Sequence, residues 1–301
     1  MSHAGGIPVL QGGEGRQQAD DLPVPGPARV TLVAVAGLSD GLQSRLTAAG
    51  VDTSGPSGQA LDPWEAWLRL RAHSGRRATL VDLYELEAAR QGIRPEELSA
   101  ADRQRLKAAS LHARRDQAEV LPGSTRGADP HEVTGYDPDW SARFQAWRDR
   151  LAAALGRSAV RIDHVGSTSV PGLAAKPIID IQVSVPEVDD ERPYLCRAES
   201  AGLVLQLRER GHRFLLPPAA EPRDVHVHIC GSGGAWERDH LLFRDYLRAH
   251  PSVCENYAAL KKELIARWCH DRKAYGDSKT EFVLDTLADA GEWAVATGWR
   301  T

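Results

Sequence analysis

The spacing of apolar residues predicts alternating helices and strands between residues 132 and 296. Near the start of this region, apolar residues recur every three to four positions, which predicts a helix with one buried face. These residues are Trp140, Phe144, Trp147, Leu151 and Leu155. An apolar run predicts a strand at residues 178–185, and apolar residues interleaved with polar ones predict strands at residues 160–165 and 225–230. Helical spacing returns over residues 236–290. The order predicts an α+β or α/β domain with a mixed sheet, flanking helices and a helical C-terminal end.

The preceding part of the chain predicts a smaller α/β domain. A β-branched run at residues 30–35, a glycine turn and a helical stretch form one strand-turn-helix unit. A helix around Trp67, a buried strand at residues 78–83 and a helix at residues 98–109 follow. We expect this domain to span residues 29–115. Its role is open between substrate selection, dimerisation and a structural appendage.

Two stretches rich in glycine, proline and polar residues predict no packed structure. Residues 1–28 have almost no apolar content, which predicts a disordered leader. Residues 116–131 string turn-forming residues together, which predicts a linker between the domains. The glycine turn at residues 37–44 contains Asp40 and lacks the lysine of a P-loop, so a P-loop kinase is not expected there.

Composition and charge narrow the classes of partner. The 301 residues carry 37 basic and 41 acidic side chains, a net charge of −4, so no global positive field is available for a nucleic acid. No apolar run reaches the length of a membrane span, and the first residues lack the pattern of a signal peptide. The four cysteines form no C-x-x-C pair, which favours reduced thiols. We therefore expect a soluble cytoplasmic protein without membrane or nucleic-acid partners.

The most informative stretch runs from His164 to Asp180. Its predicted strand ends in Gly166-Ser167, where the absence of a side chain lets the backbone approach a ligand closely. The following hydroxyls and N–H groups, from Ser167, Thr168 and Ser169, can bind phosphate oxygens. Asp180 follows inside the next apolar strand, and twelve residues separate it from Ser167. This arrangement resembles the polymerase-β-like nucleotidyltransferase superfamily, in which Gly-Ser holds a triphosphate and strand carboxylates hold divalent metal.

Residues 132–290 resemble the GrpB family of predicted nucleotidyltransferases. Six motifs in order carry the resemblance: Tyr136-Asp-Pro-Asp-Trp140, the stretch from His164 to Ile181, Asp224-Val-His-Val-His228, Phe243-Arg-Asp-Tyr-Leu-Arg248, Tyr257-Ala-Ala-Leu-Lys261 and Tyr275-Gly-Asp-Ser-Lys279. The resemblance implies a nucleotidyltransferase fold more firmly than any particular reaction. Members of the family also occur fused behind a dephospho-coenzyme A kinase, a role that the missing P-loop lysine argues against for the first domain.

The expected metal ligands depart from the superfamily pattern. Gln182 stands where a second carboxylate is expected, and the strand that would carry the third acid offers His226 and His228 on one face. Asp180, His226 and His228 are therefore the candidate metal ligands, for Mg²⁺ or Mn²⁺, or for Zn²⁺ or Fe²⁺, because imidazole suits the softer ions. Two alternatives remain: the histidines contact phosphate or substrate directly, or a histidine and Asp180 form a plain hydrogen bond.

Within the resemblance, the basic residues suggest further roles. Lys176 is a candidate catalytic residue that neutralises the triphosphate as a compact charge. Arg244, Lys261 and Lys279 are candidates for a clamp on the β- and γ-phosphates. His164 is a candidate general base, provided that its pKa lies near neutrality. Asp180 is the candidate catalytic carboxylate.

The leading functional hypothesis is transfer of a nucleotidyl group, with adenylyl the favoured one, from ATP or another nucleoside triphosphate to a small-molecule acceptor. If the acceptor is a carboxylate, the product is an acyl-adenylate, and the protein would be an ATP-dependent ligase that forms an amide-type bond in small-metabolite biosynthesis. The alternative from another class is a non-catalytic module that binds a nucleotide or metabolite, motivated by Gln182 in place of an acid.

Overall fold

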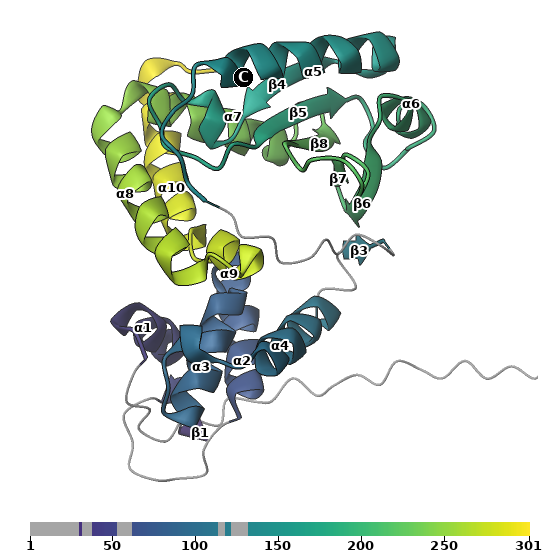
Figure 1. Ribbon diagram of the computed structural model, residues 1–301. Coiled ribbons are helices and arrows are strands. Elements are labelled where there is room, and N and C mark those ends of the chain that lie inside the picture. Colours follow the sequence, from purple (N-terminus) through teal and green to yellow (C-terminus); the bar gives the residue numbers. More distant parts are fainter. Residues whose placement is uncertain (1–29, 32–37, 53–61, 114–117, 122–131) are drawn as a thin grey trace, which may run out of the picture.

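The computed structural model describes residues 30–31, 38–52, 62–113, 118–121 and 132–301. Figure 1 shows a sheet with its helices above a smaller, mainly helical part. The predicted leader, residues 1–28, and most of the predicted linker lie outside the described residues.

The larger part is built on one mixed six-stranded sheet in the order β3-β6-β7-β8-β5-β4. The strands are β3 (Ala118–Val120), β4 (Arg161–Val165), β5 (Ile179–Val185), β6 (Val204–Glu209), β7 (His212–Leu216) and β8 (Val225–Gly231). The central strands β5 and β8 are parallel, and every other neighbouring pair is antiparallel. The expected mixed α+β fold with a helical C-terminal end is confirmed.

The two faces of the sheet differ in polarity. On one face, apolar residues of β5 and β8 form a core with α5 (Asp139–Leu155) and α6 (Leu195–Ser200). The opposite face is polar, because side chains alternate along a strand. Register places Asp180, Gln182 and Ser184 of β5 beside His226, His228 and Cys230 of β8. Helix α7 (Ala235–Ala249) covers part of this polar face, where Glu237 accepts a hydrogen bond from the Ser184 hydroxyl.

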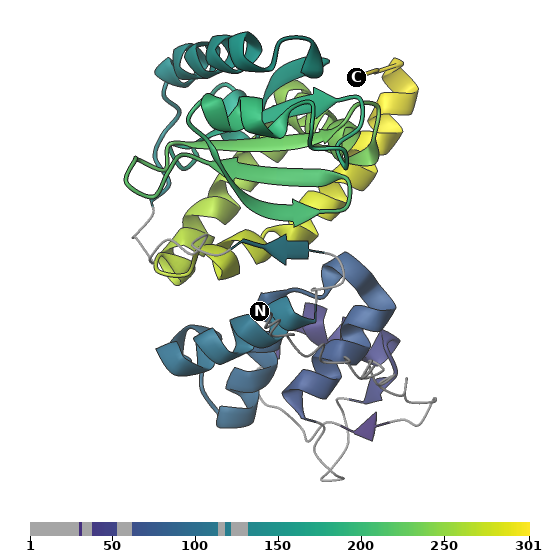
Figure 2. The ribbon, with the colours of Figure 1, turned by 90° about the vertical axis from the view of Figure 1, so that its right-hand side faces the viewer.

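The C-terminal end is helical, as predicted, and consists of α7, α8 (Pro251–Trp268), α9 (Arg272–Asp277) and α10 (Thr280–Thr297). Figure 2 shows these helices beside the sheet and α9 directed towards the smaller part. No helix in the described ranges combines the length and apolar content that crossing a membrane requires.

The smaller part contains more helix than the sequence predicts. Its helices are α1 (Asp40–Ala48), α2 (Pro63–Ser74), α3 (Leu80–Gln91) and α4 (Ala100–His112). Its described strands are the short parallel pair β1 (Val30–Thr31) and β2 (Val51–Asp52). The predicted strand at residues 78–83 is wrong, because a capping box between Thr79 and Asp82 starts α3 there. Within the predicted linker, β3 instead pairs with β6 at the edge of the sheet.

The smaller part shares its core with the C-terminal helices. Leu264 and Trp268 of α8 and Ala274 and Tyr275 of α9 belong to the same buried cluster as α1, α2 and α3. Polar contacts join the same elements, since Asp271 accepts a hydrogen bond from the Tyr84 hydroxyl at 3.1 Å. Because α9 also carries Tyr275 of the cavity described below, the first part supports one wall of that cavity. The role expected for residues 29–115 stays a prediction.

Candidate functional site

A cavity of about 180 Å³ lies where the polar face of the sheet meets the C-terminal helices. Its walls come from the turn after β4, the segment before β5, the start of β8, and helices α8 and α9. The lining residues are Ser167, Thr168, Ala175, Lys176, Ile178, Asp180, His226, Lys261, Tyr275 and Lys279. The cavity therefore brings together seven of the residues that the sequence singled out as candidates.

The Gly-Ser turn and the strand carboxylate are in direct contact. Gly166 has a φ of 67° and precedes the short 3₁₀ turn η4 (Ser167–Ser169). A Cβ atom added at Gly166 would lie 2.9 Å from Cβ of Asp180 and closer still to its Oδ2. Only glycine combines this backbone conformation with such a close approach. The turn thus places the Ser167 and Thr168 side chains beside the Asp180 carboxylate.

Three lysines from different segments reach the cavity. Nζ of Lys176 lies 3.8 Å from the centre of the Tyr275 ring, and Nζ of Lys279 lies 4.6 Å from the same centre. Lys261, on α8, is 1% exposed, donates to the Ala174 carbonyl oxygen and lies against Tyr257. Amines held this close together, with little solvent, repel one another when charged, and an anion would relieve that repulsion.

Two of these lysines have lowered pKa values. Burial, reinforced by the charge of Lys279, lowers the pKa of Lys176 to about 6. The same causes lower the pKa of Lys261 to about 7. At pH 8 both amines are mostly neutral, and a bound anion would favour their charged forms and raise both pKa values.

Anion binding at pH 8 should therefore take up protons. Sulfate is a suitable probe because it has no titratable proton near neutral pH. We expect its affinity to be highest below pH 6 and to fall as the pH rises, because the lysines must then be protonated on binding. Isothermal titration of sulfate at pH 8 in Tris and in HEPES should give enthalpies that differ with the ionisation enthalpy of the buffer. Equal enthalpies would show that neither lysine changes its protonation.

Asp180, His226 and His228 form a cluster that fits a divalent ion. One ligand atom from each of the three lies within 4.8 Å of the others. Oδ1 of Asp180 is 3.0 Å from Nδ1 of His226 and 4.0 Å from Nε2 of His228. Burial among other histidines lowers the pKa of His228 well below its ordinary value, so its ring is neutral and keeps a lone pair. One carboxylate with imidazoles suits Mn²⁺, Zn²⁺ or Fe²⁺ better than Mg²⁺.

Gln182 lies on the same polar face and is fully buried. Neither its amide oxygen nor its amide nitrogen has a hydrogen-bond partner within the described part of the chain. A buried amide left in this state costs about 1–3 kcal/mol. Register sets Gln182 beside His228. The amide of Gln182 therefore offers a donor and an acceptor on the polar face to a further ligand.

His164 and Ser169 lie behind the cavity and outside its lining. The His164 ring stacks on Phe144 with centroids 4.7 Å apart, and its Nε2 lies 3.0 Å from the Thr168 hydroxyl. Burial lowers the pKa of His164 to about 4, which makes it a weak base at pH 7. The Ser169 hydroxyl donates to the Gly166 carbonyl oxygen at 2.6 Å. This geometry favours positioning of the turn by both residues over contact with a ligand.

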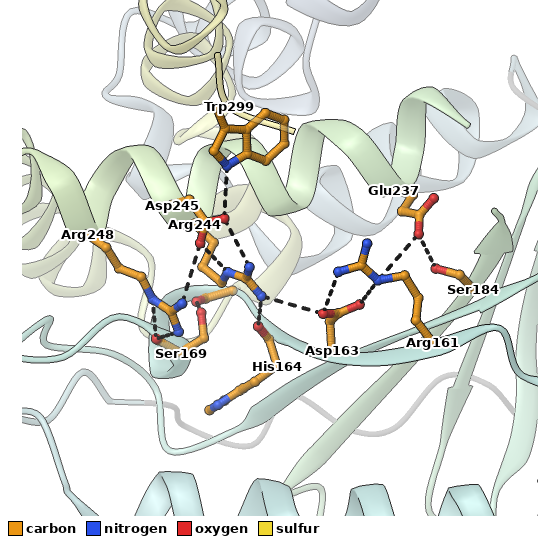
Figure 3. Close-up of polar contacts among 11 residues, drawn as sticks. Arg161, Asp163, His164, Ser169, Ser184, Glu237, Arg244, Asp245, Arg248 and Trp299 are labelled. Atoms are coloured by element: carbon orange, nitrogen blue, oxygen red, sulfur yellow. Dashed lines mark hydrogen bonds and ion pairs between the residues drawn. The ribbon is translucent and has the colours of Figure 1, made fainter. Parts of the chain in front are cut away.

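Arg244 also lies outside the lining, in a network that joins α7 to β4. Figure 3 shows its guanidinium between the Asp245 carboxylate and the His164 carbonyl oxygen, with distances of 2.7 and 3.1 Å. In the same network Arg248 donates to the Ser169 carbonyl oxygen, which connects α7 with the turn after β4. Arg244 therefore supports the turn from behind, whereas Lys176, Lys261 and Lys279 reach the cavity.

The structure adds residues that the sequence reasoning missed. Tyr275 lies between Lys176 and Lys279, although only its motif was noted. Arg223 donates from Nε to Nε2 of His226 at 3.1 Å. His212, from a strand that was not predicted, lies 3.0 Å from His228. The short alternation Leu205-Gln-Leu-Arg208 was the available signal for that pair of strands.

The comparisons with known proteins each cover slightly more than half of this chain. The family model described as GrpB protein matches residues 130–289. A UPF0157 protein of Streptomyces coelicolor is 41% identical over 159 residues, which cover 53% of this chain and 83% of that protein. A dephospho-CoA kinase of Mycolicibacterium paratuberculosis is 31% identical over 197 residues, covering 57% of this chain and 48% of the kinase. The crystal structure of conserved protein GrpB from Enterococcus faecalis has 32% identity and a TM-score of 0.48, and covers 53% of this chain and 96% of that one.

Proposed function

Because the chain belongs to the GrpB family, we propose that its cavity binds a nucleoside triphosphate, with ATP the favoured one, and transfers the nucleotidyl group to a small acceptor. One observation carries the proposal: Lys176, Lys261 and Lys279 meet the Asp180 carboxylate in one cavity. Three lysine amines beside a carboxylate suit a ligand that brings negative charge to the lysines and shares a metal with the acid. The dephospho-CoA kinase name carried by some relatives is consistent with a nucleotide ligand.

Each residue has a distinct task in the proposed reaction. The Ser167 hydroxyl binds a phosphate oxygen at the turn, whereas the Thr168 hydroxyl donates to the Ile178 carbonyl oxygen at 3.2 Å and positions the turn. The lysine ammonium groups stabilise the charge that develops on the leaving pyrophosphate. Asp180, with histidine, would hold a divalent ion, which supplies Lewis-acid polarisation of the phosphate. Tyr275 orients the amines of Lys176 and Lys279 through contacts with its ring.

The acceptor decides between two reaction outcomes. An alcohol or amine acceptor would give a nucleotidylated product, whereas a carboxylate acceptor would give an acyl-adenylate that an amine converts to an amide. A second candidate function, binding without transfer, is favoured by Gln182, because an amide replaces a carboxylate on the polar face. These functions differ in whether the triphosphate is consumed.

Release of pyrophosphate tests the proposal. The full chain would be incubated with each nucleoside triphosphate, Mg²⁺ or Mn²⁺, and pools of amino acids, small amines and small carboxylic acids. Release that requires both a nucleotide and an acceptor would support transfer, and the product mass would separate nucleotidylation from amide formation. Binding of ATP with no release in any pool would favour the binding module, and absence of ATP binding would contradict both functions.

Lys176→Ala should weaken nucleotide binding. Removing a partly buried amine that contacts the phosphates in its charged form is expected to raise the KM for the triphosphate by about tenfold to a hundredfold, which corresponds to about 1.4–2.8 kcal/mol. Lys262→Ala is the matched control, because Lys262 is the exposed neighbour of Lys261 on α8. Steady-state kinetics of both variants would check this. An unchanged KM in Lys176→Ala would remove Lys176 from the phosphate site.

A further inference from the structure

His226 and His228 present different ring nitrogens to the same carboxylate. Both side chains leave β8 on its polar face, two residues apart. Nδ1 of His226 lies 3.0 Å from Oδ1 of Asp180, whereas Nε2 of His228 lies 4.0 Å from the same oxygen. A neutral imidazole has a proton on one nitrogen and a lone pair on the other. What each ring offers to a metal therefore depends on the partner of its remote nitrogen.

The partner of His226 is a donor. Nε of Arg223 lies 3.1 Å from Nε2 of His226, and a guanidinium has only N–H groups to offer. Nε2 of His226 must therefore accept, which leaves the proton on Nδ1. That proton is donated to Asp180. His226 thus turns an N–H towards the carboxylate, and its lone pair is occupied by Arg223.

The partner of His228 is reached through a second histidine. Oε2 of Glu209 lies 3.1 Å from Nδ1 of His212, so the carboxylate accepts and His212 carries its proton on Nδ1. Nε2 of His212 then accepts from Nδ1–H of His228 across 3.0 Å. The remaining nitrogen of His228, Nε2, is left with a lone pair that faces Asp180.

Packing fixes the middle ring of this chain. His212 is 6% exposed and stacks on Trp236, with centroids 4.7 Å apart and planes at 12°. Its neighbour His228 also lies against Trp236, at 5.1 Å. An imidazole ring packed in this way cannot flip, and so swap the positions of Nδ1 and Nε2, unless its neighbours repack. The lone pair of His228 and the oxygen of Asp180 are two acceptors facing each other, an arrangement that a shared cation stabilises.

We propose that Asp180 and Nε2 of His228 bind a divalent metal while His226 remains a hydrogen-bond donor to Asp180, and that Glu209 and His212 are positioning residues that set the tautomer of His228. The proposal narrows the ligand set of Asp180, His226 and His228 expected from the sequence. A carboxylate and an imidazole, with the remaining positions open to substrate, suit Mn²⁺, Co²⁺ or Zn²⁺. The role of the metal in transfer rests on the proposed function. The tautomer assignments of the three histidines do not depend on it.

Nitrogen-15 chemical shifts of the imidazole rings test the tautomers directly. Long-range ¹H–¹⁵N spectra of the full, metal-free chain at pH 8 should show His212, His226 and His228 all protonated on Nδ1, the less common tautomer of free histidine. The Glu209→Leu variant, which removes the acceptor for Nδ1–H of His212, should lose this pattern at His212 and His228 and keep it at His226. A proton on Nε2 of His228 in the wild type would overturn the proposal.

Titration with Co²⁺ tests the ligands without any assay of transfer. His228→Gln should abolish binding, and Glu209→Leu, which leaves His212 without an acceptor, should weaken it about tenfold to a hundredfold, the range found for partners of metal-bound histidines. His226→Gln should change the affinity by less than about threefold. The matched control is Glu187→Leu, which removes an exposed carboxylate beyond the far end of β5. Equal losses in His226→Gln and His228→Gln, or an unchanged affinity in Glu209→Leu, would overturn the proposal.

The two proposals can fail separately. Absence of pyrophosphate release with intact Co²⁺ binding and the expected tautomers would contradict transfer and keep the metal assignment. The expected tautomers without Co²⁺ binding would contradict the metal assignment. Thermal unfolding of each variant would show whether a loss of binding reflects a loss of fold.

Discussion

Gly166→Ala should displace the Asp180 carboxylate and reduce transfer at least a hundredfold. The new Cβ would lie 2.9 Å from Cβ of Asp180, closer than real Cβ atoms approach one another. The Asp180 side chain or the turn must therefore move, and a shift of about 1 Å at a reacting group can cost about a hundredfold in rate. The backbone at φ 67° adds strain of about 1–3 kcal/mol for any residue with a side chain.

Gly172→Ala is the control that separates the effect of backbone strain from the displacement of the Asp180 carboxylate. Gly172 has a φ of 80°, yet a Cβ atom there would meet nothing within 4 Å. We expect this variant to lose stability in the same range and to keep transfer and Co²⁺ binding. Thermal unfolding, pyrophosphate release and Co²⁺ titration on both variants would make the comparison. Similar transfer in Gly166→Ala and Gly172→Ala would show that the close approach at Gly166 does not matter for the site.

Strand β5 could be predicted because its sequence is mostly apolar, and β8 because apolar and polar residues alternate along it. Strands β4, β5 and β8 each agree with the expected range to within one residue. The hairpin of β6 and β7 was missed because the charged residues Arg208, Glu209 and Arg213 interrupt its apolar pattern. These charges are paired in the fold, as Arg213 is with Glu191, and the sequence does not reveal such partners.

The error at residues 78–83 has a local cause. Residues 78–83 are mostly apolar, and such a short stretch is compatible with either a buried strand or a buried helix segment. The capping signal was present, since Thr79 is followed three residues later by the acidic Asp82. Asp82 also binds Arg45 of α1 at 2.7 Å, so a contact distant in sequence stabilises the start of this helix.

Candidate site residues could be predicted where a motif combined backbone and side-chain chemistry. Gly166, Ser167 and Asp180 are close in sequence and meet through one turn and two neighbouring strands. Arg244 was grouped with the cavity lysines on charge alone, but the adjacent Asp245 and the His164 carbonyl oxygen bind it on the outer side of β4. Charge identifies a possible phosphate ligand, whereas helix orientation and competing partners decide whether it reaches the site.

Asp180→Asn should reduce transfer about a thousandfold or more and leave the fold intact. The amide has nearly the same size, and its oxygen can still accept the hydrogen bond from Nδ1 of His226. It lacks the negative charge that a divalent ion requires, and losing several kcal/mol of transition-state stabilisation corresponds to a factor of about a thousand in kcat. Sulfate binding should be retained, because the lysines that bind the anion are unchanged.

Asp224→Asn is the matched control for Asp180→Asn. Asp224 directly precedes β8 and pairs with Arg143 at 3.5 Å, so removing its charge leaves the cavity carboxylate in place. We expect this variant to keep Co²⁺ binding and turnover, whereas Asp180→Asn loses both and retains its unfolding temperature. Turnover of Asp180→Asn within tenfold of the wild type would exclude a catalytic carboxylate. Because the three lysines would still bind anions, the cavity would then be an anion-binding site whose lysines, rather than a metal, act on the ligand.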